Sequence, residues 1–121
     1  LLYVGNETGI EAAKVPEAGF AFQAIRFSGM PRAVHPDRWL AWSGQLAAAV
    51  SRCRGILRAF QPTAVFATGG YVSAPVCIAA RLAGLPLQVH EPDAHPGLVN
   101  RMMAPLATQV TGAFAQSNDR L

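Results

Sequence analysis

The stretch Thr68-Gly-Gly-Tyr-Val-Ser-Ala-Pro75 predicts a turn from a strand into a helix. It follows an apolar run at 63–67 and precedes an apolar helical pattern at 76–83. Two adjacent glycines let the backbone turn sharply and approach a ligand without a Cβ in the way. Ser73 is expected to accept a hydrogen bond as the N-cap, and Pro75 suits the first helical turn. The loop is either an anion site, best suited to phosphate or diphosphate, or an ordinary turn that needs glycine only for its geometry.

Strand and helix patterns alternate along the rest of the chain. Strands are expected at 1–4, 20–27, 64–67, 87–90 and 109–114, and helices at 9–17, 36–60, 76–83 and 96–106. Strands joined by helices form right-handed crossovers and a parallel sheet. We therefore predict an α/β fold, a Rossmann-like parallel sheet with helices on both faces, in which Pro105 ends or kinks the last helix.

The composition fits one globular domain with a real core. The 121 residues are 51% hydrophobic and carry a net charge of +3. The basic residues form no dense run, so we predict no nucleic-acid partner, whereas an anionic substrate or an anionic membrane surface suits arginine. Cys53 and Cys77 fall on expected inward helix faces and are predicted to be reduced core residues. No apolar stretch approaches the ~20 residues of a membrane-spanning helix.

A second chemically dense segment is His90-Glu-Pro-Asp-Ala-His-Pro-Gly97, which follows an expected strand. Ligands bind beyond the carboxyl ends of strands in an open parallel sheet. Pro92 and Pro96 stiffen the segment, which disfavours a convergent metal site, and no metal is predicted. Three interpretations stay open: acid–base chemistry by Glu91 or His90, sugar recognition by Glu91 and Asp93, or a structural role in which Asp93 only starts the last helix.

Trp39 and Trp42 also have two interpretations. Their spacing fits the buried stripe of the long helix at 36–60. Together with Leu40, Arg32 and Arg38 they would instead form an interfacial membrane patch.

Four segments together resemble one known family. They are Gly69-Gly-Tyr-Val-Ser-Ala-Pro75, Gly84-Leu-Pro86, Val89-His-Glu91 and Pro96-Gly-Leu-Val-Asn100. Their order and content resemble the acceptor domain of the MurG family, bacterial glycosyltransferases that complete lipid II for peptidoglycan. The resemblance covers essentially the whole chain.

The resemblance implies a two-domain GT-B enzyme, peripheral on the cytoplasmic face of the bacterial plasma membrane. It would move N-acetylglucosamine from UDP-GlcNAc to undecaprenyl-diphosphate-MurNAc-pentapeptide, without a cofactor. Glu91 and Asp93 would face the donor sugar, with Glu91 the candidate catalytic residue. The region of Trp39 and Trp42 would contact the anionic inner-membrane surface. The acceptor diphosphate would be bound by Gly69, Gly70, Tyr71, Val72 and Ser73.

The chain also departs from the family pattern. Pro92-Asp93 stands where the family usually has Gln-Asn, and an aspartate cannot donate the hydrogen bonds of an amide. The family's first strand with its Gly-rich loop, and its C-terminal nucleotide-sugar domain, have no counterpart in residues 1–121. We therefore expect a partial N-terminal acceptor-binding domain that is inactive alone. The alternatives are a related GT-B transferase with another lipid acceptor, or the non-catalytic acceptor-binding half of a split glycosyltransferase.

Overall fold

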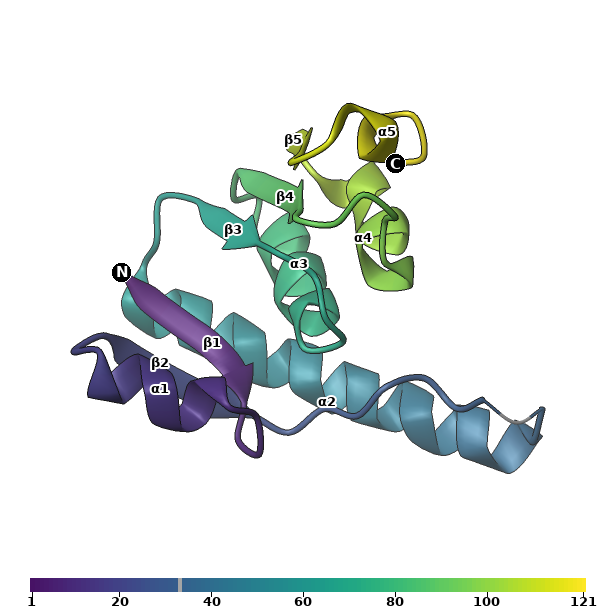
Figure 1. The fold of residues 1–121 in the computed structure, drawn as a ribbon. Helices are drawn as coiled ribbons and strands as arrows, with labels where there is room; N and C mark the ends of the chain where they lie inside the picture. The colour runs from purple at the N-terminus through teal and green to yellow at the C-terminus, as the bar shows by residue number, and fades with distance from the viewer. Residues whose placement is uncertain (33) are drawn as a thin grey trace.

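The computed structural model describes residues 1–32 and 34–121, and its elements follow the expected alternation (Figure 1). The strands are β1 (Leu2–Asn6), β2 (Ala21–Ile25), β3 (Val65–Ala67), β4 (Leu87–Glu91) and β5 (Gln109–Gly112). The helices are α1 (Glu11–Glu17), α2 (Pro36–Phe60), α3 (Ser73–Leu82), α4 (Leu98–Met103), the 3₁₀ helix η1 (Ala104–Leu106) and α5 (Ala115–Asn118).

All strand pairs are parallel, as predicted, but they form two sheets and not one. β1 pairs with β2, and β4 lies between β3 and β5. Val65 is opposite Leu87, and Val89 is opposite Val110. The predicted α/β architecture of parallel strands and helices is confirmed. The strands divide into two sheets because β1 and β3 share no hydrogen-bonded ladder, and Figure 1 shows these two strands apart.

The long helix α2 has the predicted bounds but is buried only in its middle. Pro36 occupies its first turn, and Gln61 ends it in the left-handed conformation with its N–H donating to the Leu57 carbonyl (2.8 Å). Cys53 packs with Ile25 of β2 and Ala79 of α3. The N-terminal turns of α2 extend away from both sheets (Figure 1).

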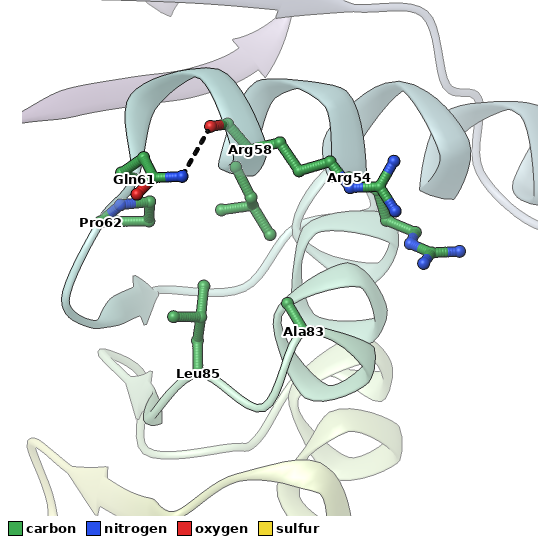
Figure 2. A pocket seen from close by; sticks show the side chains of 7 residues that line it. Arg54, Arg58, Gln61, Pro62, Ala83 and Leu85 are labelled. Atoms are coloured by element: carbon green, nitrogen blue, oxygen red, sulfur yellow. Dashed lines mark hydrogen bonds between the residues drawn. The ribbon is translucent and has the colours of Figure 1, made fainter.

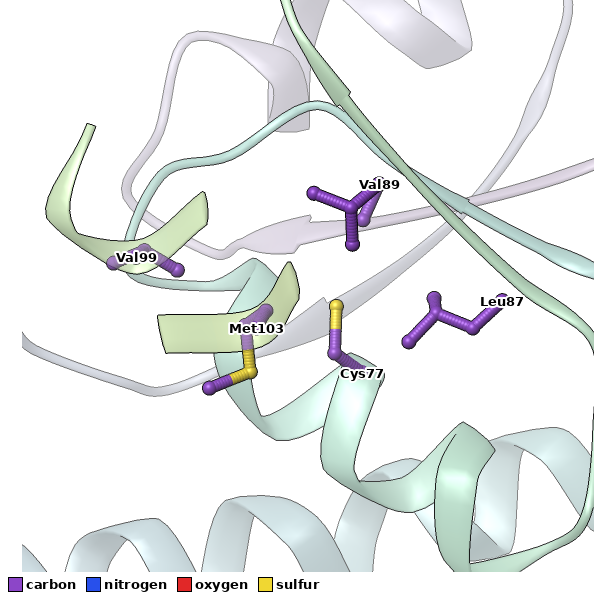
Figure 3. Packing of buried hydrophobic residues seen from close by; sticks show 6 residues of the cluster. Cys77, Leu87, Val89, Val99 and Met103 are labelled. Atoms are coloured by element: carbon purple, nitrogen blue, oxygen red, sulfur yellow. The ribbon is translucent and has the colours of Figure 1, made fainter. Parts of the chain in front are cut away.

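A second cluster of buried side chains joins β4 to the helices α3 and α4. Figure 3 shows Cys77, Leu87, Val89, Val99 and Met103 converging between these elements. Each fully buried aliphatic side chain stabilises the fold by roughly 1.5–3 kcal/mol. This packing fixes α3 beneath β4, and so fixes the loop that enters α3.

Both cysteines are free and buried, which confirms the prediction of reduced core residues. Burial raises the pKa of Cys53 to about 11 and the pKa of Cys77 to about 12. Pro105 ends α4 as predicted, and the chain passes into the short 3₁₀ helix that contains it.

Candidate functional site

The loops that follow β2, β3 and β4 meet at the carboxyl edge of the strands. A Cβ built on Gly29, after β2, would lie 2.9 Å from the ring of Tyr71. A Cβ built on Gly69, after β3, would lie 2.9 Å from Nδ2 of Asn100. Glycine at these two positions therefore allows three separate segments of chain to pack at one edge.

The loop of Gly69 and Gly70 leaves a run of backbone N–H groups without partners. The two glycines have φ of +98° and +81°, a conformation that side chains disfavour. Among the described residues, the N–H groups of Gly70, Tyr71 and Val72 donate no hydrogen bond. Three successive donors beside the N-terminus of α3 are suited to an anion.

Ser73 does not act as the predicted N-cap. Val72 is the N-cap of α3 and Ser73 is its first residue. The Ser73 hydroxyl donates to the Gly70 carbonyl (2.7 Å), and the Ser73 N–H donates to the same carbonyl (3.1 Å). The hydroxyl thus holds the turn closed, and the unpartnered N–H donors lie in the loop before the helix.

Glu91 is buried at the end of β4, with 2% of its surface exposed. Its Oε1 accepts from the Asp93 N–H (3.0 Å), and its Oε2 accepts from the Gly97 N–H (2.9 Å) and from Asn100 Nδ2 (2.8 Å). Burial alone would raise the pKa of this carboxyl, but these hydrogen bonds hold the pKa below its ordinary value. With its surface covered, Glu91 orders the loop at 92–97, and its roles as catalytic residue and sugar contact stay predictions.

Asn100 connects the two loops, a role that its sequence position did not predict. Its Nδ2 lies close to Gly69, 2.9 Å from where a Cβ on that residue would be. The same Nδ2 donates to Glu91 Oε2 and to the His90 carbonyl (3.3 Å). The side chain is buried on α4. An asparagine among apolar residues of a helix is the sequence pattern that would have indicated this role, because buried amides need hydrogen-bond partners.

The other polar residues of the segment at 90–97 differ in exposure and in hydrogen-bond partners. The His90 ring lies 3.0 Å (Nδ1) from the Thr111 hydroxyl and stacks on Phe66. Asp93 is exposed, and its carboxylate makes no hydrogen bond with the described residues. The interpretation of Asp93 as a helix cap was wrong, since α4 begins at Leu98 after Gly97 and has no side-chain cap.

The expected membrane patch divides at α2 into an exposed part and a packed part. Leu40 is 76% exposed and Trp39 39% exposed, and both arginines, Arg32 and Arg38, are exposed. Trp42 is half-buried: its ring contacts Phe27 and Trp39, and its Nε1 donates to the Ser28 carbonyl (3.3 Å). These contacts favour the interpretation that packs Trp42 against the fold over the one that exposes it in a membrane patch. Val34, 93% exposed, lies in the same region and was not predicted.

This fold defines a class, the Rossmann-like α/β domains, in which ligands bind beyond the carboxyl ends of the strands. Residues 2–111 match the glycosyltransferase family 28 N-terminal domain, and the chain belongs to this family. The resemblance to MurG proteins is confirmed by the similarities that follow.

The chain is 42% identical to the UDP-N-acetylglucosamine–N-acetylmuramyl-(pentapeptide) pyrophosphoryl-undecaprenol N-acetylglucosamine transferase of Desulforamulus reducens, over 97% of this chain and 31% of that protein. It is also 42% identical to the protein of the same name from Rubrobacter xylanophilus, over 99% of this chain and 35% of that protein. The crystal structure of MurG from Acinetobacter baumannii has a TM-score of 0.81 and 28% identity, covering 94% of this chain and 33% of that one. The chain thus spans about a third of the length of these relatives.

The hydrogen bonds of Glu91 give a testable prediction. Glu91→Gln replaces an acceptor with an NH₂ group that faces N–H donors, so the free energy of unfolding of the complete gene product should fall by roughly 1–3 kcal/mol at neutral pH. The wild-type pKa is lowered on folding, so the carboxylate's contribution is present above the ordinary pKa of 4.5 and is lost as the pH falls through the folded value. Denaturant unfolding should therefore show a gap between the two proteins that narrows in acid.

The matched control is Glu17→Gln. Among the described residues, Glu17 makes only an exposed ion pair with Lys14, and its replacement should change stability by less than about 1 kcal/mol. Equal losses in the two variants would contradict the role given to Glu91.

Proposed function

We propose that this chain binds the diphosphate of a lipid-linked acceptor for an enzyme of peptidoglycan biosynthesis. That enzyme would transfer N-acetylglucosamine from UDP-GlcNAc to undecaprenyl-diphosphate-MurNAc-pentapeptide. The names of the relatives support the proposal, because they describe this transfer to a pyrophosphoryl-undecaprenol. The observation that carries it is the run of unpartnered N–H groups at Gly70, Tyr71 and Val72.

The loop from Gly69 to Val72, called the acceptor loop from here on, suits a diphosphate for physical reasons. Backbone N–H groups hold an anion without a side chain that must be ordered, and the positive end of α3 adds to the attraction. A Cβ on Gly70 would meet no protein atom within 4 Å, so this side of the loop is open. We assign Gly69 to loop packing against Asn100, and Gly70 to close approach by the ligand.

The donor sugar is assigned to the neighbouring loop after β4. Asp93 is exposed there, and a carboxylate accepts hydrogen bonds from sugar hydroxyls. Glu91 acts through the backbone that it orders, as a positioning residue. In the transfer, an acceptor hydroxyl attacks the anomeric carbon and UDP leaves, so the two loops must be held at a fixed separation. Asn100 supplies that constraint, because it packs against Gly69 and donates to Glu91 and to the His90 carbonyl.

Gly70→Ala tests the acceptor assignment in the complete gene product. The added methyl projects into the open side of the loop and hinders the approach of a phosphate. Loss of one hydrogen bond to a charged group should raise the KM for the lipid acceptor roughly tenfold to a hundredfold, with the KM for UDP-GlcNAc unchanged. Steady-state kinetics with each substrate varied in turn measures both values.

Gly84→Ala is the matched control. Gly84 also has a positive φ (+70°) with no atom within 4 Å of a built Cβ, but it lies at the other end of α3. It therefore reproduces the backbone strain without the change at the loop. An unchanged acceptor KM in Gly70→Ala, or equal increases in the two variants, would contradict the assignment.

We also propose that the protein associates peripherally with the cytoplasmic face of the plasma membrane through the N-terminal end of α2. Val34, Trp39 and Leu40 supply exposed apolar surface, and Arg32 and Arg38 supply positive charge beside it. This combination favours the interface of an anionic bilayer. No helix within residues 1–32 and 34–121 combines the length and apolarity needed to cross a bilayer.

Leu40→Ser tests this surface. Burial of a leucine side chain in the interface contributes roughly 1.5–3 kcal/mol, so binding to vesicles that contain phosphatidylglycerol should weaken about tenfold or more. Ile10→Ser is the control, because Ile10 is 78% exposed but lies before α1. Cosedimentation with vesicles measures the binding of both variants. Equal binding by Leu40→Ser and Ile10→Ser would contradict the assignment of this surface to membrane binding.

A further inference from the structure

A cavity of about 370 Å³ lies at the edge of the fold opposite the Gly69–Gly70 loop. It is bounded by the last turns of α2, the residues that lead into β3 and those that lead into β4 (Figure 2). These segments precede their parallel strands, so the cavity lies at the amino edge of β3 and β4. The lining residues are Arg54, Leu57, Arg58, Gln61, Pro62, Ala83 and Leu85.

Two arginines provide the charge of this cavity. Arg54 and Arg58 are one helical turn apart, and Figure 2 shows both side chains extending along the same side of α2. Within the described part of the chain, neither guanidinium makes an ion pair or a hydrogen bond, and no acidic residue lines the cavity. Like charges at this spacing repel each other, so an anion between them would stabilise the helix end.

The remaining lining makes the cavity suited to more than a simple ion. Leu57, Pro62, Ala83 and Leu85 form apolar walls, and hydrogen bonds to charged groups are stronger beside apolar surface. The volume falls in the range of small-molecule sites, about 300–1,000 Å³. A second cavity of about 350 Å³ shares Leu85 and adds Arg81. The space therefore fits a phosphate group with an organic substituent.

We propose that Arg54 and Arg58 form a binding site for a phosphate ester, distinct from the acceptor loop. The planar guanidinium donors match phosphate oxygens in a two-point geometry. The Gln61 side chain lines the cavity and donates to the Arg58 carbonyl (3.2 Å), which holds the end of α2 in place. The ligand is either the headgroup of a glycerophospholipid or a free phosphate ester, and the chemistry of recognition is the same for both.

Glycerol 3-phosphate is the probe for the site. Titration calorimetry on the complete gene product should detect heat of binding for glycerol 3-phosphate. Sodium chloride added at the same ionic strength should give no such heat. Arg58→Gln and Arg54→Gln should each weaken this binding roughly tenfold or more, as expected for one lost charge-assisted contact. Arg52→Gln is the matched control: it makes the same charge change on an exposed residue of α2 that does not line the cavity, and it should leave the affinity unchanged.

Vesicles distinguish the two sources of the phosphate ester. If the ligand is a lipid headgroup, Arg58→Gln weakens binding to vesicles of phosphatidylcholine with phosphatidylglycerol more than Arg52→Gln does, and glycerol 3-phosphate competes. If the ligand is a free ester, the two variants bind these vesicles equally while the calorimetric loss persists. Binding should also survive in Gly70→Ala, which separates this site from the acceptor loop. Absence of binding to both probes, or equal losses in all three arginine variants, would overturn the proposal.

Discussion

The buried carboxylate of Glu91 is the constraint on which the carboxyl edge of this domain depends. It lies at the end of a central strand and accepts hydrogen bonds from two backbone N–H groups of the following loop and from Asn100 on α4. A buried charge is tolerated only when such partners surround it. One side chain therefore fixes the end of β4, the loop at 92–97 and the start of α4 relative to one another.

The same network extends to the acceptor loop through close packing. Asn100 lies against Gly69, where a side chain would collide with it, and Tyr71 lies against Gly29 in the same way. The loop that presents free N–H groups is thus held between two neighbouring segments, and Ser73 closes its turn. The donors are fixed before a ligand arrives, which reduces the ordering that binding must bring about. The two edges of the strands then differ in chemistry: backbone donors at the carboxyl edge, and arginine side chains at the amino edge.

Local patterns predicted the elements well and the contacts between them less well. The bounds of α2, the break at Pro105 and the turn at Gly69 and Gly70 follow from periodicity, proline and glycine, which act over a few residues. The sequence left the role of Glu91 open, since its partners Gly97 and Asn100 face it only after α4 folds back on β4. Trp42 matched both a packed helix stripe and a membrane patch in the sequence, and its contact with Phe27 favours the packed interpretation. The split into two sheets depends on strand neighbours, which no local pattern encodes.

Hydrogen exchange at the Asp93 and Gly97 amides tests the central role of Glu91 most directly. Both N–H groups lie in a loop outside any helix or strand, and Glu91 is the acceptor of each (3.0 and 2.9 Å). The account predicts that both amides are protected at neutral pH in the complete gene product, and that both lose protection in acid as the carboxylate takes up a proton. Free exchange of these two amides at neutral pH would contradict it.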